Sequence, residues 1–362
     1  GFAARPLGAI IIGRLADRRG RKFALMVTIY LMAFGTVMIG LTPTYSSIGL
    51  IAPLLIVLAR LIQGFSAGGE WGGSTAFMVE WAADNRRGFV GSFQQVSVAA
   101  GLLLGSGCAA LLSTILSEDA VTSWGWRIPF LLGGVIGLVG IYMRRNVGET
   151  PVFRRNTKAD RSEIAPKQNP VGLAARAFGF TIHWTVSYYI FLAYMPTFAI
   201  RHLELDRAVA LWSNTVGLLV LMMMAPMIGF WSDRIGRKRL LIASCLGIGI
   251  VVYPVFNYLL THPSIAAIIS AQVLFGFLIA LYSGPGPAAI AEIFETANRA
   301  TGMSVGYSLA VAVFGGFAPF IATWLIDATG SPLSPAYYVL VAAVVTALVI
   351  FRLPESAHRP FR

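Results

Sequence analysis

The chain has 362 residues, of which 56% are hydrophobic and only 12% are charged. Soluble domains carry about 25% charged residues, so this composition excludes a water-soluble globular protein. The formal net charge is +12. Because the basic residues lie in short connections between apolar runs, without a recognisable binding motif, we exclude nucleic acid as a partner and expect the loops to contact anionic lipid.

The apolar sequence falls into eleven runs, and most are long enough to cross a bilayer, whose hydrocarbon core of about 30 Å needs about 20 helical residues. The runs cover residues 1–16, 23–43, 50–80, 88–113, 127–144, 171–200, 208–231, 239–260, 264–291, 301–327 and 335–353. The sequence therefore predicts an all-α polytopic membrane protein. The first run is short and begins at Gly1 rather than Met, so we expect that the chain has lost its N-terminus together with one whole helix.

The connections between the runs differ in basic charge. Most Lys and Arg residues outside the runs lie in one set of alternate connections, whereas the other set holds only Arg127, Arg201 and Arg207. Cytoplasmic loops carry the excess of Lys and Arg, so we expect the first set to be cytoplasmic. That set includes a linker at residues 146–170 and a tail at residues 354–362.

Two patterns occur twice along the chain. The loop sequence Gly-x-x-x-Asp-Arg-x-Gly-Arg-Lys ends at Lys22 and again at Lys238. A Glu also precedes an Arg by seven residues in each half, as Glu80–Arg87 and as Glu292–Arg299. Repetition at nearly one spacing indicates two homologous halves. We expect one half bundle at residues 1–145 and a second at residues 171–353.

The duplicated loop resembles the signature loop of the major facilitator superfamily, and further motifs resemble its metabolite:proton symporter branch. These motifs lie at Arg5–Gly8, Arg60–Glu70, Trp124–Phe130, Glu149–Pro151 and Gly302–Gly316. The resemblance implies two pseudo-symmetric helical bundles with eleven of twelve helices present and helix 1 missing. It also implies a bacterial inner-membrane symporter of small carboxylates or zwitterions. The branch usually carries an acidic motif in helix 1, so a proton-coupling role of that motif cannot be assigned to this chain.

The ionisable residues inside apolar runs include Arg5, Arg60 and Glu70. A lone charge in a membrane costs from about 2.5 to more than 10 kcal/mol, so such a residue needs a partner, a wet cavity or a function. Gln63 and Glu70 face almost the same way on a helix, beside several glycines that would admit a neighbouring backbone or a ligand. One hypothesis is that Arg5 and Arg60 attract a substrate carboxylate and that Glu70 carries the coupled proton. The alternative is structural pairing between helices.

Other polar side chains within the apolar runs are weaker candidates for substrate contact. Gln95, Tyr188 and Tyr189 could orient a substrate, although such residues more often form hydrogen bonds between helices. His183 could relay a proton, but a packing role is the alternative. The sequence Ser283–Pro287 contains two Gly and two Pro residues and predicts a break in its helix, either as a bending element or as a static kink.

The duplicated loops predict charged clusters at the cytoplasmic helix ends. We expect Asp17, Arg21, Glu80 and Arg87 to lie together, and Asp233, Arg237, Glu292 and Arg299 to repeat the group. By resemblance, these residues close the cytoplasmic side of the outward-open state. The alternative is that they form ordinary surface ion pairs, which contribute under about 1 kcal/mol each.

The preferred functional hypothesis is import of a small organic acid by proton symport through alternating access. One alternative is proton symport of a zwitterionic compatible solute such as proline or betaine, and another is a membrane sensor that does not transport. The expected partners are the solute, protons and the lipid bilayer, with the protein as a monomer. No metal-ligand, nucleophile–base or nucleotide-binding pattern is present, so we expect no catalytic residue, metal or cofactor.

Overall fold

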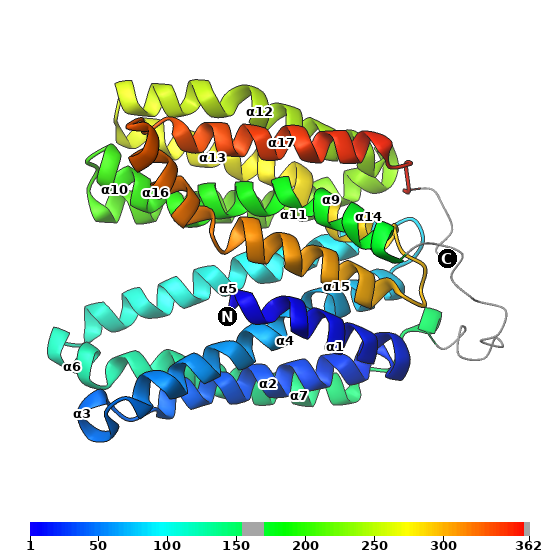
Figure 1. The fold of residues 1–362 in the computed structure, drawn as a ribbon, viewed down its shortest axis with the longest axis horizontal. Helices are drawn as coiled ribbons and strands as arrows, with labels where there is room; N and C mark the ends of the chain where they lie inside the picture. Colours follow the sequence, from blue (N-terminus) through cyan, green and yellow to red (C-terminus); the bar gives the residue numbers. More distant parts are fainter. Residues whose placement is uncertain (154–169, 358–362) are drawn as a thin grey trace. The chain divides into compact units, whose positions relative to one another are not determined.

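A computed structural model describes residues 1–153 and 170–357, and every regular element in those ranges is a helix (Figure 1). Nine of the helices described there are long and apolar enough to cross a membrane. The all-α prediction is therefore confirmed. Most of the predicted linker at 146–170 and the end of the predicted tail at 354–362 lie outside the described residues.

The chain forms two compact units, and each unit includes a short segment from elsewhere in the sequence. The first unit consists of Gly1–Trp81, Gly101–Gln168 and Thr296–Ser308. The second unit consists of Ala82–Ala100, Asn169–Glu295 and Leu309–Arg362. As a result, helix α5 (Arg87–Ile115) begins in the second unit, whereas helix α15 (Arg299–Ala310) begins in the first.

The first unit is built on helix α4 (Ile51–Trp81). Helices α1 (Arg5–Arg19) and α2 (Arg21–Leu41) both pack on α4, and α7 (Ile128–Asn146) packs on α2. Glycines of α4 allow this close packing, because a Cβ atom added to Gly68 would lie 2.0 Å from the carbonyl oxygen of Arg5. The short elements are η1 (Phe2–Ala4), α3 (Tyr45–Ile48), α6 (Glu118–Ser123) and η2 (Gly125–Arg127).

The second unit contains a larger set of helices. These are α9 (Pro170–Tyr189), η3 (Ile190–Tyr194), α10 (Met195–His202), α11 (Arg207–Ile235), α12 (Arg237–Thr261), α13 (Ile265–Ser283), α14 (Gly286–Ala291), η4 (Val311–Gly315), α16 (Ala318–Thr329) and α17 (Ser334–Arg352). Helix α11 packs on α13, and α17 packs on both α12 and α9.

Nine spans in the described residues, rather than eleven, reflect two local features. Helix α1 has only 15 residues, which is short for a full crossing. The run at 171–200 divides into α9, the π-helical segment η3 and α10, where Pro196 cannot donate the hydrogen bond that a regular helix needs. The predicted break near residues 283–287 is confirmed, because α13 ends at Ser283 and α14 begins at Gly286.

Candidate functional site

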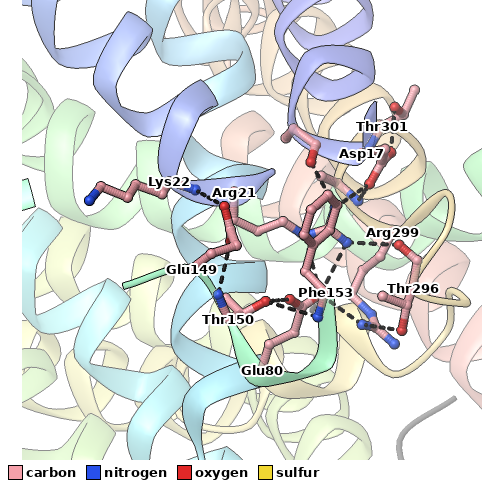
Figure 2. Close-up of polar contacts among 12 residues, drawn as sticks. Asp17, Arg21, Lys22, Glu80, Glu149, Thr150, Phe153, Thr296, Arg299 and Thr301 are labelled. Carbon is pink, nitrogen blue, oxygen red and sulfur yellow. Dashed lines mark hydrogen bonds and ion pairs between the residues drawn. The ribbon is translucent and has the colours of Figure 1, made fainter. Parts of the chain in front are cut away.

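A buried charged cluster in the first unit centres on Glu80, at the end of α4 (Figure 2). Two guanidinium groups share the Glu80 carboxylate, because Arg21 lies 3.1 Å and Arg299 2.9 Å from Oε1. Thr150 donates a hydrogen bond of 2.6 Å to the other oxygen, Oε2. The side chain of Glu80 is 0% exposed, so the surrounding protein has replaced its water completely.

Arg21 connects three parts of this cluster. Its Nη1 donates to Asp17 of α1 at 3.0 Å, and its Nη2 donates to the carbonyl oxygen of Thr296 at 2.7 Å. A planar guanidinium has five N–H donors in a fixed geometry, so one Arg can satisfy several acceptors at once. Arg21 therefore links α1, α4 and the segment just before α15.

Asp17 binds the N-terminus of α15. Its two carboxylate oxygens accept backbone N–H groups from Ala300 at 3.1 Å and Thr301 at 2.9 Å, and the Thr301 hydroxyl donates as well. The first N–H groups of a helix have no partner within the helix, and its dipole favours an anion there. Asp17 thus holds the start of α15 in the first unit.

The second unit contains the matching cluster around Glu292. Arg237 donates to the Glu292 carboxylate at 3.2 Å and to Asp233 at 2.7 Å. Asp233 accepts the backbone N–H groups of Gly88 at 2.8 Å and Phe89 at 2.9 Å, at the start of α5. The same device is therefore present in both units: an Arg pairs with two acids, and one acid binds the N-terminus of a helix.

The two clusters differ from the expected grouping in one respect. Arg299, and not Arg87, joins Glu80, while Arg87 lies 3.7 Å from Glu292 and also pairs with Asp84. The exchange follows from the helix N-termini, because Asp17 holds the start of α15 and Asp233 holds the start of α5. Arg299 therefore pairs with Glu80 in the first unit, and Arg87 lies near Glu292 in the second unit. The other members are grouped as predicted.

Sequence reasoning did not assign one further pair of residues to each cluster. Glu149 accepts the N–H of Lys22 at the start of α2, and Thr150 contacts Glu80. In the second unit Glu355 accepts the N–H of Arg237 at 2.9 Å, and Ser356 donates to Glu292. The signal was visible as an acidic residue followed by a hydroxyl residue after the last apolar run of each half.

The loop glycines leave room for these carboxylates. Gly20 and Gly236 have φ angles of 107° and 103°, which favour glycine. A Cβ atom added to Gly20 would lie 2.2 Å from Glu149, and one added to Gly236 would lie 2.6 Å from Glu355. Burial raises the pKa of Glu355, but hydrogen bonds from four backbone N–H groups outweigh this effect and lower the pKa below its ordinary value of 4.5.

The predicted polar stripe on α4 is partly connected. The exposed Arg60 donates to Gln63 at 3.3 Å, and Gln63 donates to Thr36 of α2 at 2.8 Å. Glu70 is half-buried, and it lies ten residues from Arg60, or about 15 Å along the helix. Arg5 is half-buried, and its guanidinium lies over the ring of Phe2 at 4.5 Å. The structure therefore joins Arg60 to Gln63, while Glu70 lies too far along α4 for a direct ion pair with Arg60.

The weaker candidates lie in the second unit. Gln95 is buried and donates to the neighbouring Gln94, whereas Tyr188 and Tyr189 are half-buried, with ring centroids 6.1 Å apart. His183 is buried between Ser187, 3.3 Å from Nδ1, and Ser244, 3.5 Å from Nε2. Because Ser244 already donates to a carbonyl oxygen, it can accept a hydrogen bond from Nε2, so His183 connects α9 to α12.

The described residues contain no group of three or more His, Cys, Asp or Glu side chains that could hold a metal ion.

Comparisons with known proteins give a consistent result. Residues 177–362 match the family model "Major Facilitator Superfamily", and residues 2–168 match "Sugar (and other) transporter". The proline/betaine transporter of Escherichia coli K12 is 31% identical over all of this chain and 74% of its own length. A glycine betaine/proline/ectoine/pipecolic acid transporter of Dickeya dadantii, OusA, is 32% identical over the same shares of the two chains.

Solved structures share the fold. The proton:xylose symporter XylE superimposes with a TM-score of 0.81 at 16% identity, covering 98% of this chain and 85% of that one. The fucose:proton symporter FucP of E. coli has a TM-score of 0.70 at 13% identity. The superposition covers 97% of this chain and 90% of the FucP chain. At these identities the likeness concerns the fold alone.

Proposed function

The chain belongs to the major facilitator superfamily, and from that premise we propose that it is a proton-coupled symporter of a zwitterionic compatible solute of the proline or betaine kind. The observation that carries this proposal is the pair of relatives at 31% and 32% identity, both named for such solutes and both aligned over the whole chain. In our proposal the protein works as a monomer in the plasma membrane of a bacterium.

The proposal replaces a small organic acid as the preferred substrate. That hypothesis rested on Arg5 and Arg60, whose guanidinium groups could hold a carboxylate. A zwitterion carries a carboxylate too, so these residues are equally compatible with proline or betaine. The names of these relatives therefore support a zwitterion over an organic acid as the proposed solute.

We propose that the two charged clusters act as latches during alternating access. In the first unit Asp17, Arg21 and Glu80 hold the start of α15, and in the second unit Asp233 holds the start of α5. Since α15 begins in one unit and its chain continues in the other, releasing these contacts would free a helix end to move. The duplication of the device in both units supports this role over unrelated surface ion pairs.

A direct experiment is uptake of labelled betaine, proline, oxoglutarate and citrate by cells that lack their own systems, at pH 6 and pH 8. We expect uptake of betaine or proline, faster at pH 6, where the inward proton gradient is larger. Uptake of oxoglutarate or citrate alone, lost in Arg60→Ala, would favour the organic acid. Tight binding of a solute without accumulation would favour a sensor.

A further inference from the structure

Two aromatic rings of the first unit lie face to face. The ring centroids of Trp71, on α4, and Tyr307, on α15, are 3.6 Å apart, with only 2° between the ring planes. Aromatic pairs usually prefer an offset or edge-to-face arrangement over a face-to-face sandwich. Each ring therefore covers a flat, electron-rich face of the other, and a cation could compete for either face.

The pair lies at a depth suited to a transported solute. Trp71 lies ten residues before the end of α4, and Tyr307 lies eight residues after the start of α15. At about 1.5 Å per residue these positions are about 15 Å and 12 Å from the helix ends. Half of a hydrocarbon core of about 30 Å is about 15 Å, and transporters of this kind bind their substrates near the bilayer midplane.

Two buried hydroxyl groups adjoin the rings. Thr75, on α4, and Ser304, on α15, are each one helical turn from the stacked residues, and both are 0% exposed. Neither hydroxyl has a hydrogen-bond partner among the residues that the structure describes. A buried polar group without a partner is unfavourable, so a ligand or water is expected to satisfy it.

Helices α4 and α15 approach each other closely at this point, because α4 carries a glycine where Ser304 packs. A Cβ atom added to Gly72 of α4 would lie 2.0 Å from the Ser304 hydroxyl oxygen. The half-buried Glu70 directly precedes Trp71 in the sequence and brings a carboxylate to the same level of α4. The aromatic pair and the two hydroxyl groups thus lie within about one helical turn of each other along α4 and α15.

We propose that this group of residues recognises the zwitterion itself. The ring faces of Trp71 and Tyr307 bind the substituted ammonium by cation–π attraction, and the hydroxyls of Thr75 and Ser304 donate hydrogen bonds to the carboxylate. In the structure the rings cover each other, and a bound solute takes the place of one ring when the start of α15 moves away from α4. This inference rests on the proposed function, because it assumes a zwitterionic solute.

The test is solute binding to purified protein, measured by calorimetry for betaine and for proline, with uptake measured in parallel. Trp71→Leu and Tyr307→Leu remove the ring faces, and we expect each to weaken betaine binding about tenfold, or about 1.4 kcal/mol. Tyr307→Phe keeps the face and should bind betaine nearly as the unchanged protein does. Ser304→Ala removes one hydroxyl and should weaken binding of both solutes.

A second stacked pair supplies the matched control. Phe191 and Phe275 of the second unit have ring centroids 3.7 Å apart with 12° between the planes, and both are fully buried. Phe191→Leu should lower thermal stability as much as Trp71→Leu while betaine affinity stays within twofold. If Trp71→Leu and Tyr307→Leu also stay within twofold while the unchanged protein binds and imports betaine, the inference is overturned and the proposed function survives. If the unchanged protein binds neither solute, both are overturned.

Discussion

Neutralising Glu80 is the sharpest perturbation of the first charged cluster. In Glu80→Gln the side chain keeps its shape but loses its charge, while the guanidinium groups of Arg21 and Arg299 stay buried around it. The amide nitrogen also cannot accept the hydrogen bond that Thr150 donates to Oε2. Two buried cations therefore lose the anion that they share.

The size of the effect follows from this burial. Removing one partner from a buried ion pair costs about 3–5 kcal/mol, because an uncompensated charge stays in a low-dielectric environment. For a folded unit of 150–250 residues, each kcal/mol lowers Tm by about 2–4 °C. We therefore expect Glu80→Gln to lower Tm by roughly 8–16 °C for a loss of about 4 kcal/mol.

The assay is thermal unfolding of the purified protein in detergent, followed by a thiol-reactive dye, because Cys245 is buried in the folded chain. Asp84→Asn is the matched control: it makes the same change of charge beside Arg87, but the side chain of Asp84 is 84% exposed. Because water reaches the Asp84 carboxylate, its ion pair with the buried Arg87 is screened and should contribute about 1 kcal/mol or less, so the control should lower Tm by less than about 4 °C. Equal losses in the two variants would refute the reasoning.

Three further predictions use the same melting assay. Glu292→Gln should cost less than Glu80→Gln, because Arg87 lies 3.7 Å from Glu292 whereas Arg299 lies 2.9 Å from Glu80; a reversed order would contradict this. Gly20→Ala should cost about 1–3 kcal/mol, because its φ of 107° suits glycine. Gly101→Ala, in open space within α5, should instead be neutral or stabilising by up to about 1 kcal/mol, because Ala favours a helix interior more than Gly does. Since the pKa of Glu355 is lowered from 4.5, its carboxylate stabilises the fold above pH 4.5, and that stabilisation is lost as the pH falls through the lowered pKa. Glu355→Gln should remove this pH dependence, and an unchanged acid limb of the Tm profile would exclude the role.

The residues of both clusters could be predicted from sequence because the pattern occurs twice. Two loops repeat Gly, Asp, Arg and Lys at the same spacing, which indicates that both loops form the same contacts. In the structure Asp17 and Asp233 each accept backbone N–H groups at the start of a helix. Membrane helices could also be predicted, because their length and hydropathy are set by the bilayer rather than by packing.

The ion-pair partners of Arg87 and Arg299 could not be predicted from the repeated pattern. Asp233 binds the N-terminus of α5, which carries Arg87, and Asp17 binds the N-terminus of α15, which carries Arg299. These tertiary contacts place each Arg in the cluster opposite to the one expected from sequence. The stack of Trp71 on Tyr307 joins residues 236 positions apart, without any periodic signal to indicate it. Glu149 and Glu355 were predictable in principle, because an acid followed by a hydroxyl residue recurs after each half.

Proton movement driven by solute in sealed proteoliposomes tests the central claim most directly. With a pH-sensitive dye inside and no pH gradient at the start, added betaine or proline should acidify the lumen, because each imported solute brings protons with it. Conversely, an imposed gradient of one pH unit, acidic outside, should drive about tenfold accumulation for one proton per solute. Uptake of either zwitterion that leaves the luminal pH unchanged, and that stops at equal concentrations under the gradient, would contradict the account.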